Sequence, residues 1–237
     1  MNRNQIKYLA VAAMLIDHIA WQFVPLGSTL GQMMHFIGRL TGPTMAFFLV
    51  EGYLHTRSLS RYAMRLGIFA LLSWVPYSLF EKGSWPTLQF GVVYTLFLSL
   101  LALWVWDRSG WPKGARVAAV LALCLLSVFG DWPVYDILFA LLFLRWHEDD
   151  RRKWIAYAAV AACIMIDAIA AKGNRGLFQT GVLVLPPLIL RLYNGQPGRR
   201  NLFHKWFFFI FYPAHLLFLW WFASRGIIAS HIWMLTR

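Results

Sequence analysis

The sequence predicts an all-α fold, a polytopic bundle of about nine transmembrane helices with the N-terminus inside and the C-terminus outside. Hydrophobic residues make up 59% of the 237 residues and charged residues only 14%. A soluble domain carries about 25% charged residues. Apolar runs of about twenty residues, enough to cross a hydrocarbon core, recur along the chain. We therefore expect residues 1–237 to form a single integral-membrane domain in a lipid bilayer.

Nine apolar segments are the candidate spans. They cover residues 5–25, 32–54, 62–80, 87–106, 114–130, 133–146, 154–171, 177–193 and 204–222. The fifth and sixth are short and meet in a Gly-Asp-Trp-Pro segment at 130–133, so they are either two tilted spans or a hairpin that does not fully cross. The first run follows Arg3 and Lys7, as in a signal peptide. Because Asp17 and His18 interrupt it and no cleavage site follows, we expect an uncleaved first span.

The distribution of Lys and Arg predicts the orientation. With the N-terminus in the cytoplasm, sixteen of the 22 basic residues fall on the inner side and five on the outer side, while Arg39 lies within a span. The inner residues are Arg3, Lys7, Arg57, Arg61, Arg65, Arg108, Lys113, Arg116, Arg145, Arg151, Arg152, Lys153, Arg191, Arg199, Arg200 and Lys205, and the outer ones are Lys82, Lys172, Arg175, Arg225 and Arg237. Topology thus explains the formal charge of +12, and we expect no nucleic-acid partner.

Ionisable residues within the spans are the first candidates for a functional site. They come from five spans and share the outer half of the membrane: Asp17, His18, Arg39, Asp136, Asp167 and His215. Charges at this depth must pair with one another or face an aqueous cavity. One interpretation is structural, with Arg39 and one aspartate forming a neutral pair that sets helix register. The other interpretation is acid–base chemistry.

The acid–base interpretation assigns the catalytic roles to four residues. A neutral imidazole can accept a proton from a nucleophile, and a carboxylate can orient it and stabilise its cation. We expect His18 to be this base, with Asp17 in support, Arg39 at the developing negative charge or balancing Asp17, and His215 as a second candidate. Adjacent helical residues are about 100° apart, so Asp17 either orients His18 through water or pairs with Arg39. The two cysteines, in apolar runs, indicate neither a disulfide nor a metal site.

Basic residues at the inner ends of the spans are the candidates for binding a polyanion. Lys7 and His18 share one helix face about 16 Å apart, and Arg61 and Arg65 are four residues apart on another helix. The candidate binding residues are Lys7, Arg57, Arg61, Arg65, Asn194 and Arg199, with His55, Arg191 and Arg200 on the same side. Positive-inside bias alone also explains such residues. A sharper reading is coenzyme A, with its phosphates at the basic end and its arm rising toward His18.

The chain resembles the TraX family of conjugation proteins, including the TrbP-like members. The resemblance is carried, in order, by the segments Met-Leu-Ile-Asp-His-Ile (14–19), Ile-Gly-Arg-Leu (37–40) through Pro43, and Glu-Gly-Tyr with His-Thr-Arg (51–57). Further segments are Arg-Tyr with Arg-Leu (61–66), Leu-Tyr-Asn-Gly with Gly-Arg (192–199) and Phe-Tyr-Pro-Ala-His-Leu (211–216). The family is similar to the membrane acyltransferase-3 group, whose basic residue and His in the first span match Lys7 and His18.

The resemblance implies a bacterial inner-membrane acetyltransferase that modifies the N-terminal amine of a pilin subunit in conjugation. Acetyl-CoA is the implied donor, and no metal is expected. Three alternatives stay open. In the first, the acetyl acceptor is a glycan or lipid hydroxyl. In the second, the protein is a proton-coupled transporter that uses the intramembrane acids. In the third, it is a pilin-assembly factor without catalysis.

Overall fold

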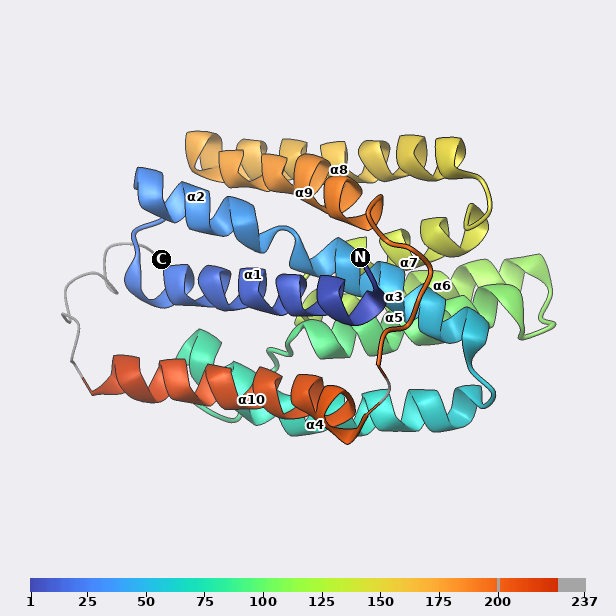
Figure 1. The fold of residues 1–237 in the computed structure, drawn as a ribbon, viewed down its shortest axis with the longest axis horizontal. Coiled ribbons are helices and arrows are strands. Elements are labelled where there is room, and N and C mark those ends of the chain that lie inside the picture. Colours follow the sequence, from blue (N-terminus) through green and yellow to red (C-terminus); the bar gives the residue numbers. More distant parts are fainter. Residues whose placement is uncertain (200, 226–237) are drawn as a thin grey trace. The chain divides into compact units, whose positions relative to one another are not determined.

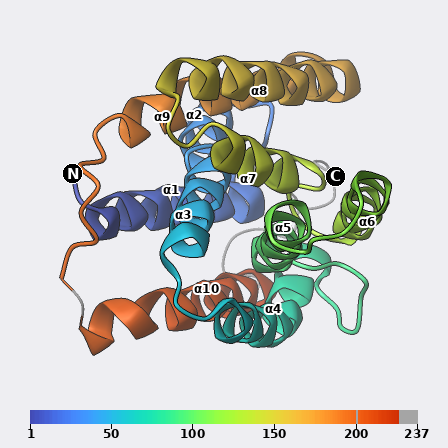
Figure 2. The same ribbon diagram turned by 90° about the vertical axis from the view of Figure 1, so that its right-hand side faces the viewer.

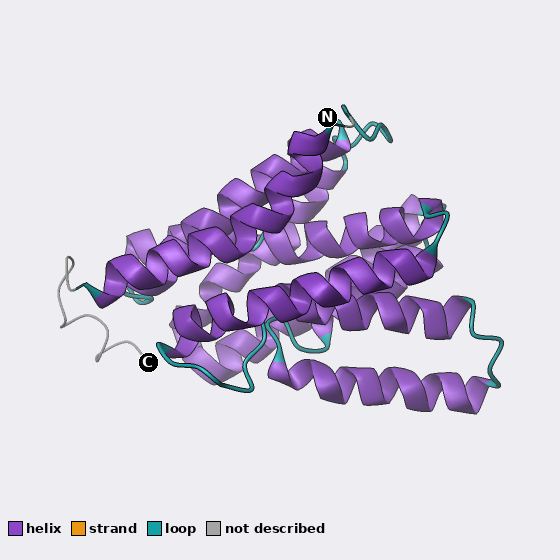
Figure 3. Cartoon of the chain, turned by 90° about the horizontal axis from the view of Figure 1, so that it is seen from below, coloured by secondary structure: helices purple, strands orange, loops and turns teal. Residues whose placement is uncertain are grey.

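The computed structural model describes residues 1–199 and 201–225, most of which lie in helices (Figures 1 and 3). The basic residues Arg200 and Arg237 lie outside the described residues. The helices are α1 (Arg3–Phe23), α2 (Thr29–Gly38), α3 (Thr41–His55), α4 (Leu59–Lys82), α5 (Val92–Asp107), α6 (Lys113–Leu126), η1 (Ser127–Phe129), α7 (Tyr135–Arg145), α8 (Asp150–Lys172), η2 (Gly173–Gln179), α9 (Thr180–Leu190) and α10 (Leu202–Ser224). The described part contains no strand beyond an isolated bridge between Phe90 and Gly130. The predicted all-α class is confirmed.

Among residues 1–199 and 201–225, three stretches of helix are long and apolar enough to cross a membrane. They are Leu59–Lys82, Asp150–Leu190 and Trp206–Ser224, and Val92–Asp107 is a shorter apolar helix. The second stretch comprises α8, η2 and α9. These stretches mark the chain as a multi-pass membrane protein. The number of nine spans and their orientation stay predictions.

The chain forms two compact units, and the prediction of a single domain stays untested. The first unit comprises Met1–Thr44 and Ala161–Arg237. Within it, α1 packs against α2 and α10, and α2 packs against α9 and η2 (Figure 1). Helix α1 begins with a capping box, in which the Asn2 side chain accepts from the Gln5 N–H and the Gln5 side chain accepts from the Asn2 N–H. These helices position the site described below.

The segment predicted as one span, residues 32–54, consists of two helices separated by Arg39 and Leu40. Pro43 explains the break, because its nitrogen cannot donate to the carbonyl of Arg39 and its ring clashes with that carbonyl in a continuous helix. The Arg39 N–H donates to the carbonyls of His35 and Phe36, and the Thr41 hydroxyl donates to the Ala10 carbonyl of α1 at 2.9 Å. The break therefore places the Arg39 side chain directly beyond the end of α2, against α1.

The second unit, Met45–Val160, is organised around α5. Helix α5 packs against α4, α6 and α7 (Figure 2). Leu98, Ala102 and Ile137 form a buried cluster where α5 meets α7. In the first turn of α7, Asp136 is fully buried, and its Oδ2 lies 2.7 Å from the hydroxyl oxygen of Thr95 on α5. Asp136 thus has its hydrogen-bond partner inside this unit.

Candidate active site

Asp17 is the centre of a buried polar cluster between α1 and α2. Its Oδ2 accepts from Nη2 of Arg39 at 2.7 Å, and its Oδ1 lies 2.8 Å from Nδ1 of His35. Arg39 also donates through Nε to the backbone carbonyl of His35. The three side chains are buried, with His35 fully so. Of the two arrangements left open by the sequence, the structure has the pairing of Asp17 with Arg39.

Gly38 permits this close approach of the two helices. A Cβ at this position would lie 2.4 Å from Cβ and Cγ of Asp17, which is closer than real side chains come. Gly181 of α9 plays the same part on the other side of α2, where a Cβ would lie 2.4 Å from the carbonyl oxygen of Phe36. Two glycines thus allow α2 to approach α1 and α9 closely.

His18 points to a different neighbour from Asp17. Its Nδ1 lies 2.7 Å from Nε2 of His215 on α10, and the two rings are stacked at 5.0 Å and 6°. Both side chains are buried. Adjacent residues on a helix point about 100° apart, which is why Asp17 contacts α2 while His18 contacts α10. The structure therefore brings His18 and His215, two of the predicted catalytic residues, into direct hydrogen-bond contact.

The hydrogen bonds determine the tautomers of the two neutral imidazoles. Nδ1 of His215 lies 2.8 Å from the backbone carbonyl of Phe211, which can only accept, so this nitrogen carries the proton. Nε2 of His215 is then an acceptor, and Nδ1 of His18 must donate to it. The lone pair of His18 consequently lies on Nε2. This orientation of one imidazole by another is suited to a proton acceptor.

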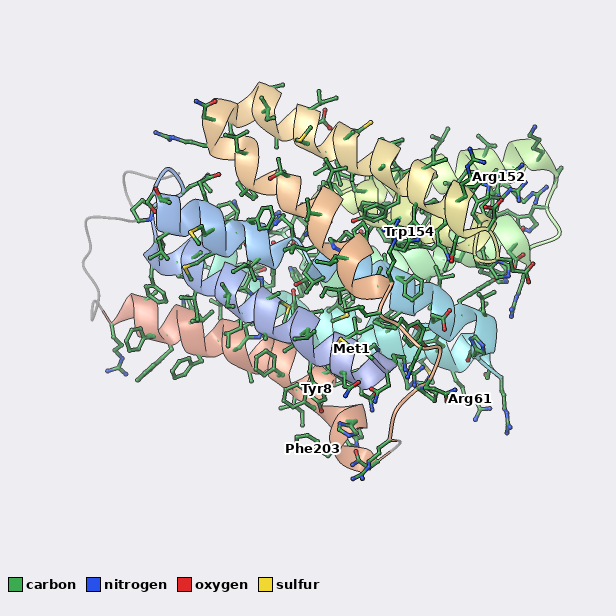
Figure 4. All side chains as sticks on the ribbon, turned by 45° about the horizontal axis from the view of Figure 1, so that its top comes forward. Met1, Tyr8, Arg61, Arg152, Trp154 and Phe203 are labelled. Carbon is green, nitrogen blue, oxygen red and sulfur yellow. The ribbon has the colours of Figure 1, made fainter. Side chains whose placement is uncertain are left out.

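Lys7 also faces α10. Its Nζ lies 5.5 Å from the centroid of the Phe208 ring, seven residues before His215. Lys7 and His18 therefore share one face of α1, as their spacing predicts. Beside Lys7, the hydroxyl of Tyr8 lies 2.6 Å from Nδ1 of His204. Figure 4 shows Tyr8 near the first turn of α10. The N-terminal turns of α1 and α10 are thus joined by polar and aromatic contacts.

The turn before α10 lies against the start of α1. The Asn194 N–H donates to the Met1 carbonyl, the Arg3 N–H donates to the Gln196 carbonyl, and the Asn4 side chain donates to the Arg199 carbonyl at 2.8 Å. The Asn194 side chain accepts from the Gln196 N–H. Asn194 and Arg199, which the sequence grouped with Lys7, are therefore tied to the helix that carries Lys7.

The remaining predicted binding residues belong to the second unit. Arg57, Arg61 and Arg65 are exposed, and the last two lie one turn apart on α4, where Arg61 projects outward in Figure 4. Asp136 belongs to this unit too, whereas Asp167 lies exposed on the part of α8 that belongs to the first unit. Among the described residues, no group of three or more His, Cys, Asp and Glu side chains is placed to hold a metal ion.

His35 is the member of the cluster that sequence reasoning missed. An available signal was its spacing from Arg39, because residues four apart lie on the same face of a helix. The Trp21 and Phe178 rings lie 4.4 and 5.3 Å from its ring centroid, so it reads as an apolar position occupied by a histidine. Its contact with Asp17 depends on how α1 and α2 pack, which spacing alone does not determine.

The comparisons with known proteins agree over almost the whole chain. The family model described as TraX protein matches residues 2–223. The probable fimbrial assembly protein FimC, serogroup H1, of Dichelobacter nodosus is 32% identical over 239 residues, which cover 92% of this chain and 97% of the relative. No solved structure matches the chain. The family match includes α1, α2 and all but the last residue of α10, the helices that carry Asp17, His18, His35 and His215. The chain belongs to the TraX family.

Proposed function

We propose that this protein is a membrane acetyltransferase that moves an acetyl group from cytoplasmic acetyl-CoA to the N-terminal amine of a pilin subunit. The observation that carries the proposal is the hydrogen-bonded series from the Phe211 carbonyl through His215 to His18, buried within the helices. This series presents a basic nitrogen of defined tautomer. Family membership supports the acetyl group and the pilin, because the resemblance to TraX proteins implies acetylation of a pilin.

His18 is the proton acceptor in the proposed step. Its Nε2 takes a proton from the amine while the amine nitrogen attacks the thioester carbonyl carbon, and a nitrogen–carbon bond forms. When the carbon–sulfur bond breaks, the thiolate of coenzyme A takes the proton back from Nε2. The products are the acetylated amine and the free thiol. His215 keeps the His18 ring oriented and shares the positive charge that His18 acquires during the step.

Asp17 supports His18 through its charge. Its oxygens are bound by Arg39 and His35, so it acts as the fixed negative charge adjacent to the cation that forms on His18. Arg39 balances Asp17 in the resting protein. This arrangement favours the balancing role for Arg39 over direct contact with the negative oxygen of the reacting thioester. Among the catalytic candidates, proton transfer thus belongs to His18 and His215, and electrostatic support to Asp17 and Arg39.

Acetyl-CoA supplies the reactive thioester, and its phosphates require cationic partners. The residues present fit this need, since guanidinium and ammonium groups are the usual protein partners of phosphate. Within the first unit, Lys7 and Arg199, with the Asn194 turn beside them, are the candidate groups. Arg57, Arg61 and Arg65 are exposed groups of the same kind within the second unit. All of them are at helix ends or in loops that the charge distribution assigns to the cytoplasm.

The proposed acceptor is a processed pilin lodged in the same bacterial inner membrane. The name of the relative, a probable fimbrial assembly protein, supports a role in making pili or fimbriae. The proposed depth of His18, slightly outward of the membrane midplane, suits a donor from the cytoplasm and an acceptor from the other side.

The decisive experiment is mass spectrometry of a pilin that is co-expressed with the protein. The wild type should add one acetyl group to the N-terminus, and His18→Ala should reduce the acetylated fraction at least about a hundredfold, as expected for loss of a general base. His147→Ala is the matched control, because His147 is exposed and its ring contacts neighbours in the sequence, the Leu144 carbonyl and the Glu148 carboxylate. Full acetylation by His18→Ala would contradict the assignment.

A second candidate is a pilin-assembly factor without catalysis. The relative's name, which mentions assembly and no chemistry, favours it. This candidate predicts that His18→Ala cells form normal pili with unmodified subunits, whereas cells that lack the whole protein form none. Electron microscopy of pili together with mass spectrometry of their subunits separates the two candidates.

A further inference from the structure

The two oxygens of Asp17 are both bound from one face of α2. His35 and Arg39 are four residues apart, so their side chains lie one above the other on this face. The ring Nδ1 of His35 takes Oδ1 and the guanidinium of Arg39 takes Oδ2, at 2.8 and 2.7 Å. Arg39 alone already compensates the charge of Asp17. The bond from His35 therefore adds geometric control over the carboxylate beyond neutralisation.

The packing around His35 shows that this geometric control has a cost. A carboxylate can only accept, so Nδ1 of His35 carries the proton and Nε2 carries the lone pair when the ring is neutral. Among the described residues Nε2 has no hydrogen-bond partner, and the side chain is 0% exposed. A buried acceptor without a partner is destabilising. A phenylalanine would pack between Trp21 and Phe178 without this cost, so the Nδ1–H is what the histidine contributes.

The bond to Asp17 also constrains the helix that carries His18. Asp17 and His18 are consecutive, so a fixed direction for the Asp17 side chain fixes the rotation of α1 about its own axis. That rotation directs His18 toward His215 on α10, where the ring nitrogens are 2.7 Å apart. Gly38 keeps α2 close to α1 at this point, because position 38 has no side chain to push the backbone of α2 away from Asp17.

We propose that His35 is a positioning residue, which uses its Nδ1–H on Asp17 to hold α1 in the rotation that sets the hydrogen bond between His18 and His215. The inference rests on the proposed function for its effect on catalysis, and its structural part stands apart from it. His35 touches neither substrate nor His18 in this scheme. Its contribution reaches the reaction through Asp17 and α1.

A pair of substitutions tests the position of the donated proton. In His35→Asn the amide nitrogen lies close to where Nδ1 was, while in His35→Gln it reaches toward the place of Nε2. His35→Asn should keep kcat within about threefold of the wild type. His35→Gln should lower kcat about tenfold to a hundredfold, the cost of a misplaced catalytic group, and leave KM for acetyl-CoA unchanged. Equal activity of the two variants, at either level, would overturn the proposal.

A readout without catalysis separates this inference from the proposed function. With ¹⁵N-labelled histidine, NMR of the protein in bilayers reports which ring nitrogens carry protons, and His18→Ala and His215→Ala identify the relevant signals. The wild type and His35→Asn should show a protonated Nδ1 on His18 bonded to Nε2 of His215, and His35→Gln should lose this pattern. If the wild type transfers no acetyl group, the proposed function fails, and the NMR comparison still decides on His35. An unchanged pattern in His35→Gln would contradict the positioning role.

Discussion

At the scale of single residues, the buried carboxylate of Asp17 is stabilised by its ion pair with Arg39. The guanidinium of Arg39 and the carboxylate of Asp17 are both buried, and removal of one charge leaves the other uncompensated. Arg39→Ala should therefore lower the free energy of unfolding by about 3–5 kcal/mol. Thermal unfolding in detergent measures this loss.

The matched control is an ion pair at the surface. Arg152 and Asp149 are partly or largely exposed and lie 3.3 Å apart, so Arg152→Ala should cost about 0–1 kcal/mol. Equal losses in the two variants would mean that the pair of Asp17 and Arg39 contributes no more than a surface contact.

The sequence predicted several residues of the site, but not all their contacts. Asp17, His18, Arg39 and His215 stand out because ionisable groups inside apolar helices are costly. Sequence could not decide between a water-bridged Asp17 and one paired with Arg39, because that choice depends on helix rotation. It missed His35 for the same reason, since a histidine among apolar residues resembles a packed core position.

At the scale of helices, the contact between α1 and α2 depends on Gly38. A methyl group there would meet Asp17 at 2.4 Å, so Gly38→Ala should push the helices apart and weaken the bonds of His35 and Arg39 to Asp17. We expect a stability loss of about 1–3 kcal/mol, typical of overpacking, and a lower acetylation rate. Thermal unfolding and the pilin assay measure the two effects.

Gly114→Ala on α6 is the control for this substitution. A Cβ at Gly114 meets nothing within 4 Å, and alanine is favoured over glycine in a helix by about 0.5–1 kcal/mol. This variant should be as stable as the wild type or slightly more stable, with unchanged activity. A Gly38→Ala protein that behaves like it would disprove the close-approach argument.

The element boundaries show where sequence reasoning succeeds. The predicted segments 5–25 and 62–80 correspond to α1 and α4, because hydrophobic length is a strong signal. The division of 32–54 into α2 and α3 was missed although Pro43 signals it. A search for apolar length does not detect such a break. The backbone groups at the break form hydrogen bonds within the protein, so the sequence around it can stay apolar.

At the scale of the whole molecule, the apolar segments predict nine spans, and the distribution of basic residues predicts that the C-terminus lies outside. Alkaline phosphatase, which is active only outside the cytoplasm, should be active when fused after Gly83 or Ser224 and inactive when fused after Trp146. Helices α6 and α7 are the most sensitive part of this prediction. With 14 and 11 residues they measure about 21 and 16 Å, less than a hydrocarbon core of about 30 Å.

A fusion placed between these two short helices, after Asp131, tests whether they cross. Activity there indicates two spans in a locally thinned bilayer, as the nine-span topology requires. Inactivity there, with activity retained after Gly83 and Ser224, would replace the two spans by a hairpin that enters and leaves on the inner side. Sequence could not decide this point because the short length fits both arrangements.

The acceptor that orients His215 belongs to the main chain, and this has a consequence for mutational robustness. Every substitution at position 211 retains the carbonyl that receives the proton of Nδ1. An orienting carboxylate, by contrast, would be lost through a single nucleotide change in its codon. Random mutagenesis should therefore find position 211 tolerant of apolar exchange and position 215 intolerant. Inactivating changes near this end of the series should fall on His215 itself or on residues that reshape the α10 backbone.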